Sequence, residues 1–432
     1  MLAMFGFCII AVLLILIMTR RTSVIVALVT VPVVFGLMAG LGRELGGFMM
    51  DGLIGVAPTG IMLTFAILYF SVMNDAGMFD PIVRGIIRFA GNDPVKIVMG
   101  TGLIAMLAHL DGSGASTFLI CIPAMLPIYD HLGIDKRILA CMAALGAGTM
   151  NFVPWGGPTL RAATSLHLEM RDLFNPVIPA LGSGLLTVLL IGFWLGKKER
   201  IRLGHQVNKV DMDYDAHTST ENRELKRPRL FLFNVLLTVV SIIFLVKGIT
   251  PLPAVFVVAL AIALIVNYPD VNTQQERITA HGKAAILMIA IIFAAGIFTG
   301  ILKSSGMIKE MAEAMVAVVP QRLGGHLPVL TAITSMPASL LFDPDSYYFG
   351  VLPVLSSAAE AFQVPGVEIA RAAILGQMTT GFPVSPLTAS TFLLVGLAGV
   401  DLADHQKRTI PLAFLITVVM TIVAVITGAF GL

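Results

Sequence analysis

Long apolar stretches constrain this chain more than any other feature of its sequence. About ten of them approach the roughly 20 residues that a helix needs to cross the hydrocarbon core of a bilayer. The predicted spans are residues 2–18, 23–41, 54–73, 138–166, 174–195, 230–247, 252–267, 284–302, 369–400 and 409–430. A chain of this kind folds as a polytopic all-α membrane protein, because a helix satisfies its own backbone hydrogen bonds in lipid.

Composition supports this class and excludes others. Hydrophobic residues make up 57% of the 432 residues and charged residues 12%, whereas soluble domains have about 45–50% and about 25%. A formal net charge of +2 without a basic patch argues against a nucleic-acid partner. The three cysteines are isolated, so they predict neither a disulfide framework nor a soft-metal site.

Two further apolar regions are too long for one crossing and are interrupted by polar residues. Residues 95–129 contain LDGSGAST, and residues 328–362 contain FDPDS. Non-helical backbone at membrane depth must face protein or a water-filled cavity. We therefore expect a pair of re-entrant hairpins, each with a polar tip.

The distribution of basic residues predicts the topology. Counting crossings with basic loops on the cytoplasmic side puts the charged linker, residues 197–229, in the cytoplasm and both termini outside. Residues 1–196 and 230–432 then form two halves of opposite orientation, each with about five transmembrane helices and one hairpin. Each half also has a proline-broken helix, at about 138–166 and 369–400.

An internal repeat predicts the same inversion. Three features recur at offsets of 229 or 230 positions: DAGMF at 75–79 with SSGMI at 304–308, Pro123 with Pro353, and Pro154 with Pro383. Inverted repeats whose broken helices meet near the midplane are a signature of secondary transporters. We therefore expect the hairpin tips and the broken helices to surround one site.

The residues at these four breaks suit an oxygen-rich anion. Half-helix N-termini carry a partial positive charge and unpaired N–H groups, and hydroxyl side chains add donors and acceptors. The predicted substrate-binding residues are Ser113, Gly114, Ser116, Thr117, Asn151, Gly156, Gly157, Pro158, Thr159, Arg161, Ser346, Ser385, Pro386 and Thr388. Among them, Arg161 is the candidate for a bidentate carboxylate contact.

Three acidic residues in the hairpins oppose a bare anion. Asp111, Asp343 and Asp345 lie in apolar segments, where a charge costs about 2.5–3.5 kcal/mol and so indicates function. They are predicted to bind a metal ion or protons. Oxygen ligands suit Mg²⁺ or Ca²⁺, which would arrive as part of the substrate rather than as a permanently bound cofactor.

Structural interpretations of the same residues stay open. Asp111 and Asp343 can act as helix caps, and Arg161 can extend to the outer surface instead of binding substrate. His109 fits a packed, hydrogen-bonded histidine better than a proton carrier, and Trp155 can be an interfacial anchor.

Two regions carry specific motifs: His109 to Leu166 contains LDGSGAST, IPAMLPIY and PWGGPTLRAA, and a later region contains PVSPLTASTFLLVGLAGVDL. They resemble the CitMHS family of proton-coupled symporters for citrate complexed with divalent metal ions. The resemblance covers nearly the whole chain apart from the linker. It implies the ion transporter superfamily, a homodimer, and an elevator mechanism with a scaffold and a moving transport domain. Dicarboxylate transporters of that superfamily carry Ser-Asn-Thr at both tips, where this chain has Asp111 and Asp343 to Ser346.

The predicted function is therefore proton-coupled symport of a citrate–metal complex across the plasma membrane, in a bacterium the inner or cytoplasmic membrane. The alternative is a Na⁺- or H⁺-coupled carrier of free citrate or dicarboxylate. An enzyme is not expected, because the sequence contains neither G-x-S-x-G nor H-E-x-x-H. Two occluding hairpins also suit alternating access better than an open channel.

Overall fold

The computed structural model describes residues 2–19, 21–204, 224–316 and 324–431, and in these ranges all regular secondary structure is helical. The helices of the first half are α1 (Leu2–Met18), α2 (Val24–Met38), α3 (Leu45–Asp75), α4 (Asp80–Ala90), α5 (Pro94–Ala108), η1 (His109–Asp111), α6 (Gly114–Leu132), α7 (Lys136–Met150), α8 (Gly157–Leu166), α9 (Met170–Phe174), η2 (Asn175–Val177) and α10 (Ile178–Leu203). Those of the second half are η5 (Pro228–Leu230), α11 (Phe231–Lys247), α12 (Leu252–Asn267), α13 (Val271–Ser304), α14 (Met307–Val316), α16 (Leu327–Ala338), η6 (Ser346–Val351), α17 (Leu352–Ala361), α18 (Gly366–Ile374), η7 (Gly376–Thr380), η8 (Phe382–Val384), α19 (Ala389–Ala398) and α20 (Leu402–Ile426).

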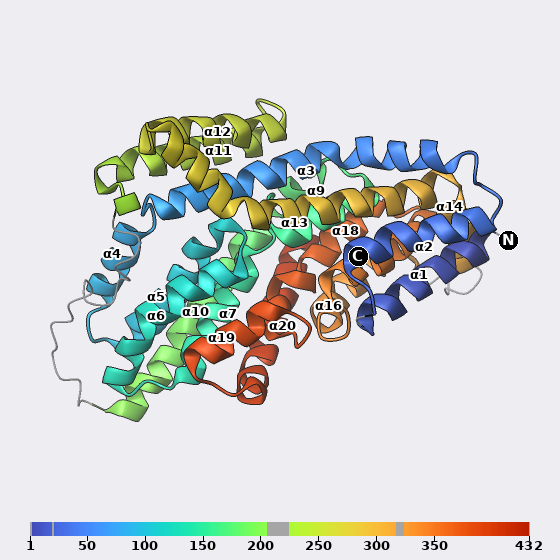
Figure 1. Cartoon of the computed structure of the whole chain (residues 1–432). Helices are drawn as coiled ribbons and strands as arrows, with labels where there is room; N and C mark the ends of the chain where they lie inside the picture. The colour runs from blue at the N-terminus through green and yellow to red at the C-terminus, as the bar shows by residue number, and fades with distance from the viewer. Residues whose placement is uncertain (1, 20, 205–223, 317–323, 432) are drawn as a thin grey trace.

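Two long helices, α3 and α13, pack along each other through small residues (Figure 1). They run antiparallel, since Asp75 at the end of α3 bonds His281 near the start of α13, whereas Ser304 at the end of α13 bonds Asp51 near the start of α3. A Cβ on Gly52 would overlap the carbonyl of Gly296. Small residues let helix backbones approach closely in lipid, so these glycines make the crossing possible.

The helices around this pair form one side of the molecule. α12 packs on α3, and α2 packs on α13 while α1 contacts α14; Figure 1 shows α11 and α12 lying outside α3. Two polar links hold α11 in place. Tyr69 and Thr238 share a hydrogen bond of 2.7 Å, and the amides of Asn234 and Asn267 bond each other at 2.8 and 2.9 Å.

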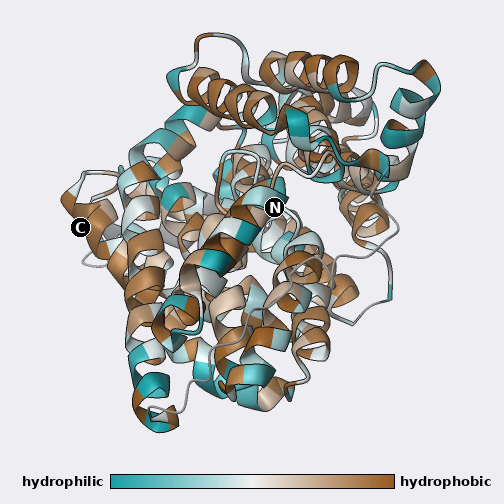
Figure 2. Ribbon diagram, turned by 90° about the vertical axis from the view of Figure 1, so that its left-hand side faces the viewer, coloured by the Kyte–Doolittle hydropathy of each residue, from teal (hydrophilic) through white to brown (hydrophobic). Residues whose placement is uncertain are grey.

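The other side contains both hairpins and both broken helices. α5 packs against α7 and α10, α16 against α18 and α20, and α6 against α19. Apolar residues run along most of the helices, whereas hydrophilic ones gather at many helix ends and loops (Figure 2). At the centre of this side, Leu139 to Leu145 of α7 are all fully buried, and three of these seven residues are alanines. Helices of this kind can pack closely enough to place their breaks in contact.

Seven helices in the described ranges are long and apolar enough to cross a membrane, or eight if the bent pair 366–384 and 389–398 forms one span. α1 and α12 have the predicted bounds, whereas α3 and α13 are longer than predicted. The two legs of the first hairpin, α5 continued by η1 (Pro94–Asp111) and α6 (Gly114–Leu132), are among the seven, so each has the length of a full span. The first residues of the predicted linker, 197–203, continue α10 as helix, and residues 205–223 of that linker lie outside the described residues.

Candidate functional site

The tip of the first hairpin lies between η1 and α6. Gly112 adopts a φ of 72°, a conformation that glycine permits without steric cost. Asp111 Oδ1 accepts a hydrogen bond of 2.8 Å from the Ser113 amide, and Ser113 Oγ caps α6 by accepting from the Ser116 amide at 3.3 Å. Asp111 therefore orders the turn itself. The N-terminal end of α6 begins at Gly114, directly behind it.

The first broken helix stops at Met150 and resumes at Gly157. The turn between them closes tightly, since a Cβ on Gly156 would overlap the carbonyl oxygen of Asn151. Pro158 occupies the first turn of α8, where its missing N–H costs nothing. Thr159 Oγ1 donates to the Phe152 carbonyl at 2.9 Å and so closes the break.

The second broken helix has an additional kink that the sequence analysis missed. It was predicted to break at Pro383 to Thr388, but the backbone already leaves the helix at Gln377, with a ψ of 126°, and at Met378, with a φ of 54°. A second interruption follows at Ser385 before α19 begins. A positive φ in a non-glycine residue stores strain that surrounding structure must hold.

The tip of the second hairpin is organised by Asp343. Its Oδ1 accepts from the amides of Asp345 and Ser346 at 3.0 and 3.1 Å, and its Oδ2 accepts from the Ser346 hydroxyl. This is the capping role that the sequence analysis left open for Asp343. The following π-helix, η6, begins at Ser346 and buries Tyr347 and Tyr348.

All four breaks meet, as predicted. Asn151 is the central link: its Oδ1 bonds His109 Nε2 at 3.0 Å, and its Nδ2 donates to the Met378 carbonyl at 2.5 Å. Trp155 Nε1 donates to the Leu110 carbonyl at 2.7 Å, which joins the first break to the first tip. A Cβ on Gly114 would lie 2.9 Å from the Phe382 ring, which is the contact between the first tip and the second break.

Two aromatic side chains near the first tip, His109 and Trp155, are buried in the protein. His109 is fully buried, bonds Thr117 Oγ1 at 2.7 Å and stacks on Phe382, which is the packed histidine that we expected. The interpretation of Trp155 as an interfacial anchor is wrong, since only 4% of it is exposed and its ring stacks on Phe70.

Arg161 and Asp345 form a buried ion pair between α8 and the second hairpin. Arg161 Nε donates to Asp345 Oδ1 at 2.6 Å, and the two residues are 5% and 9% exposed. Arg161 also donates to the Gly157 carbonyl at 3.3 Å. The alternative in which Arg161 extends to the outer surface is therefore wrong: its guanidinium points into the protein.

The remaining predicted residues lie at the same breaks but mostly serve the fold in this conformation. Thr117 Oγ1 donates to the Ser113 carbonyl at 2.8 Å, and Ser385 Oγ donates to the Ser339 carbonyl at 2.5 Å. Gly157 lies against Met378. Pro386 and Thr388 are half-buried in the segment before α19, and the Thr388 side chain makes no capping bond.

The three predicted acids do not converge on one point. Within the described ranges, no group of three or more His, Cys, Asp or Glu side chains is arranged to hold a metal ion. Asp345 instead faces Arg161, while Asp111 and Asp343 each bond their own hairpin.

Three residues of this centre, Ser339, Tyr348 and Gln377, were not predicted from the sequence. Ser339 donates to Gln377 Oε1 and accepts from the Met378 amide at 3.2 Å, so the second tip is bonded directly to the early kink. The fully buried Tyr348 hydroxyl donates to the Gln377 carbonyl at 2.8 Å. The sequence feature that could have indicated the early kink is QMTT, a segment with three polar residues between two glycines in an apolar span.

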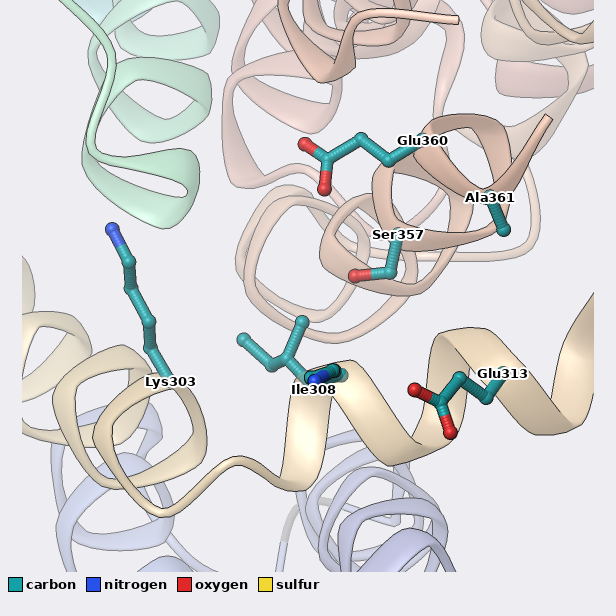
Figure 3. Close-up of a pocket in the computed structure, with 7 residues that line it drawn as sticks. Lys303, Ile308, Glu313, Ser357, Glu360 and Ala361 are labelled. Carbon is teal, nitrogen blue, oxygen red and sulfur yellow. The ribbon is translucent and has the colours of Figure 1, made fainter. Parts of the chain in front are cut away.

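A cavity of about 560 Å³ lies apart from this centre, between α13, α14 and α17. Lys303 and Glu360 extend into it from opposite walls, and Glu313 and Ser357 also line it (Figure 3). A second cavity of about 150 Å³ shares Lys303 and Glu360 and reaches Ser165 to Leu168 at the end of α8. The two cavities thus extend from α14 to the helix that carries Arg161.

The fold of this helical membrane bundle is similar to that of a solved transporter structure. The crystal structure of the YdaH transporter of Alcanivorax borkumensis superposes with a TM-score of 0.65 at 14% identity, covering 90% of this chain and 89% of that one. The chain belongs to the CitMHS family, whose citrate transporter model matches residues 11–376. The resemblance drawn from the motifs is thereby confirmed.

Relatives from Bacillus subtilis (strain 168) match along their full length. One named citrate transporter is 47% identical over 428 residues, 99% of both chains. One named Mg(2+)/citrate complex secondary transporter is 46% identical over 433 residues, 100% of both. Similarity at this level over whole chains makes this protein a multi-pass member of a secondary transporter family.

Proposed function

We propose that this protein is a proton-coupled secondary transporter of citrate complexed with a divalent metal ion. The observation that carries the proposal is the Arg161–Asp345 pair, buried where four helix breaks meet. A buried charge without its partner is strongly unfavourable. Any ligand that separates this pair must therefore supply both an anionic group for Arg161 and a cation for Asp345.

A citrate–metal complex has both signs of charge. A free carboxylate of citrate would take the place of Asp345 on Arg161, and the released Asp345 would face the metal ion or accept a proton. A metal that arrives already held by citrate oxygens needs few additional ligands. This agrees with the absence of a three-residue metal cluster in the described ranges. The relative named as a Mg(2+)/citrate transporter favours Mg²⁺.

The remaining carboxylates suit coupling to protons. Asp111 and Asp343 cap turns at the two tips and accept backbone N–H groups. Protonation would weaken these bonds, because a carboxylate accepts stronger hydrogen bonds than the neutral acid. We therefore propose that proton binding and release at the tips accompany loading and unloading of the ligand.

We further propose an elevator mechanism in a homodimer with two inverted repeats, 1–196 and 230–432, in the plasma membrane, with both termini outside. The antiparallel α3–α13 pair supports the inversion, since corresponding helices of inverted repeats run in opposite directions. The side built on α3 and α13 would be the scaffold, and the side with both hairpins would move. The cavities around Lys303 and Glu360 lie where these two sides meet, which suits an entry route for a ligand of mixed charge.

The test is uptake of labelled citrate by proteoliposomes containing the purified protein, with and without divalent ions. Uptake should require Mg²⁺ or a similar ion and an inward proton gradient, and EDTA should abolish it. Equal uptake after chelation would refute the metal-complex proposal and favour a carrier of free citrate or dicarboxylate. Replacing the proton gradient with a Na⁺ gradient separates the two coupling ions.

A further inference from the structure

A cavity of about 240 Å³ lies between the ends of α10 and α20, and none of the residues proposed for the transport site lines it. Trp194 and Lys198 of α10 and Arg408 and Pro411 of α20 line it. α10 and α20 pack along each other, so the cavity opens at the end of their shared groove. This is the end of α10 that leads into the charged linker.

The charged groups of this cavity leave positive charge without a partner. Lys198 Nζ lies 3.7 Å above the Trp194 ring, and among the described residues it has no carboxylate partner. Arg408 pairs with Asp135 at 3.2 Å through one nitrogen, but its other terminal nitrogen is buried without a hydrogen-bond partner. Glu199 also lines the cavity, yet Arg202 holds both of its oxygens.

The surroundings are those of a membrane surface. Leu190, Phe193 and Trp194 of α10 are about half exposed, as is Leu415 of α20, and in a bilayer such side chains face lipid chains. Tryptophan favours the level of the headgroups, and lysine extends from the apolar region to the same level. Basic pockets between membrane helices bind anionic headgroups.

We propose that this cavity binds the phosphate of an anionic membrane phospholipid. Lys198 contacts the phosphate oxygens directly, and the Arg408 side chain, which is 30% exposed, turns its unpartnered nitrogen toward them. An acyl chain lies along the exposed apolar residues of α10 and α20. A lipid bound there links α10 and α20 and, through Arg408 and Asp135, the start of α7. The proposal is independent of which substrate is transported.

The chain has two tryptophans, which makes a direct test possible. Trp155 is buried and Trp194 is 48% exposed, so only Trp194 is open to quenching by lipid. The protein is reconstituted into phosphatidylcholine vesicles that contain either brominated phosphatidylglycerol or brominated phosphatidylcholine at equal mole fraction. We expect the anionic lipid to quench Trp194 with an apparent affinity about tenfold higher. The variant Trp155→Phe isolates the same signal.

The double variant Lys198→Gln/Arg408→Gln should abolish this preference, and Lys198→Gln alone, on an exposed residue, should reduce it without a risk to folding. The matched control is Lys197→Gln/Lys407→Gln, which removes two charges from exposed positions on the same helices and should retain the preference. Equal quenching by both lipids would overturn the proposal. So would an equal loss in the control pair, or displacement of the brominated lipid by inorganic phosphate at millimolar concentration.

Discussion

Arg161 and Asp345, 184 residues apart in the chain, form a buried ion pair of 2.6 Å that joins the first broken helix to the second hairpin. Neither residue is exposed enough for water to screen the pair. The pair therefore stabilises the fold, and we propose that it also binds the substrate. Substitutions can separate its contribution to stability from its contribution to transport.

Asp345→Asn should reduce citrate uptake at least tenfold and destabilise the protein, because it leaves Arg161 buried without a counter-charge. Breaking a buried pair in this way costs about 3–5 kcal/mol. Thermal melting in detergent measures the stability, and proteoliposome uptake measures the transport.

The double variant Arg161→Gln/Asp345→Asn removes both charges, so it should recover most of the lost stability but none of the uptake. Asp404→Asn is the control, since that side chain is 55% exposed and surface pairs contribute little. Recovered uptake in the double variant would mean that the pair has only a structural role.

Asp343→Asn separates the charge of this residue from its cap. Asparagine caps a helix about as well as aspartate, so the bonds to Asp345 and Ser346 should persist and the melting temperature should change little. We expect the dependence of uptake on the divalent ion, on the proton gradient or on both to be lost or reordered, as measured by uptake across a series of divalent ions with and without an inward proton gradient.

Asp343→Ala is the companion variant, because it removes the cap as well and should also lower the melting temperature, at a cost of about 1 kcal/mol. If Asp343→Asn transports with unchanged dependence on both the divalent ion and the proton gradient, Asp343 is a cap and takes no part in coupling.

Gly156→Ala should abolish uptake. The added methyl group would overlap the Asn151 carbonyl, and the turn would have to open and displace the amide that links His109 to Met378. Gly182→Ala is the matched control within α10, where nothing lies within 4 Å of the new Cβ; it should be neutral or slightly stabilising, by up to about 1 kcal/mol. Full uptake by Gly156→Ala would show that the first break tolerates a wider turn.

Stability at low pH should depend on Asp135, at the start of α7. Partial burial raises the pKa of Asp135, but hydrogen bonds and charge from Arg137, together with Arg408, outweigh burial and hold the pKa below its usual value. Because the folded pKa is lower than the unfolded one, about 3.9, the stabilisation is present above that pH and is lost as the pH falls through the folded pKa.

Melting temperatures measured as the pH falls below about 4 should therefore decline less steeply in Asp135→Asn than in the parent protein. Asp130→Asn is a suitable control, since its carboxylate is half exposed beside Lys136. Identical pH profiles for the parent and Asp135→Asn would contradict the prediction.

Much of the architecture could be predicted from local features. Each predicted span coincides with helical structure, and α1 and α12 begin and end where predicted. Seven helices of the described ranges, or eight with the bent pair, are long and apolar enough to cross a membrane, against the ten predicted. Prolines, glycines and acids in apolar segments marked the four breaks, because each is unfavourable in a plain membrane helix. The kink at Gln377 and Met378 was missed, since neither residue has a strong local preference against a helix; bonds from Ser339 and Tyr348 hold it.

The sequence by itself determined that this chain is a helical membrane protein, because the solvent that each segment prefers follows from its own residues, and its motifs indicated the citrate transporter family. It also marked the breaks at which proline, glycine or an acid interrupts an apolar segment. Only the tertiary structure decided what the breaks contact. It paired Arg161 with Asp345 rather than with the outer surface, and it made Asn151 the bridge between the two halves. Such pairings depend on the distance between residues remote in the chain, which no local pattern contains.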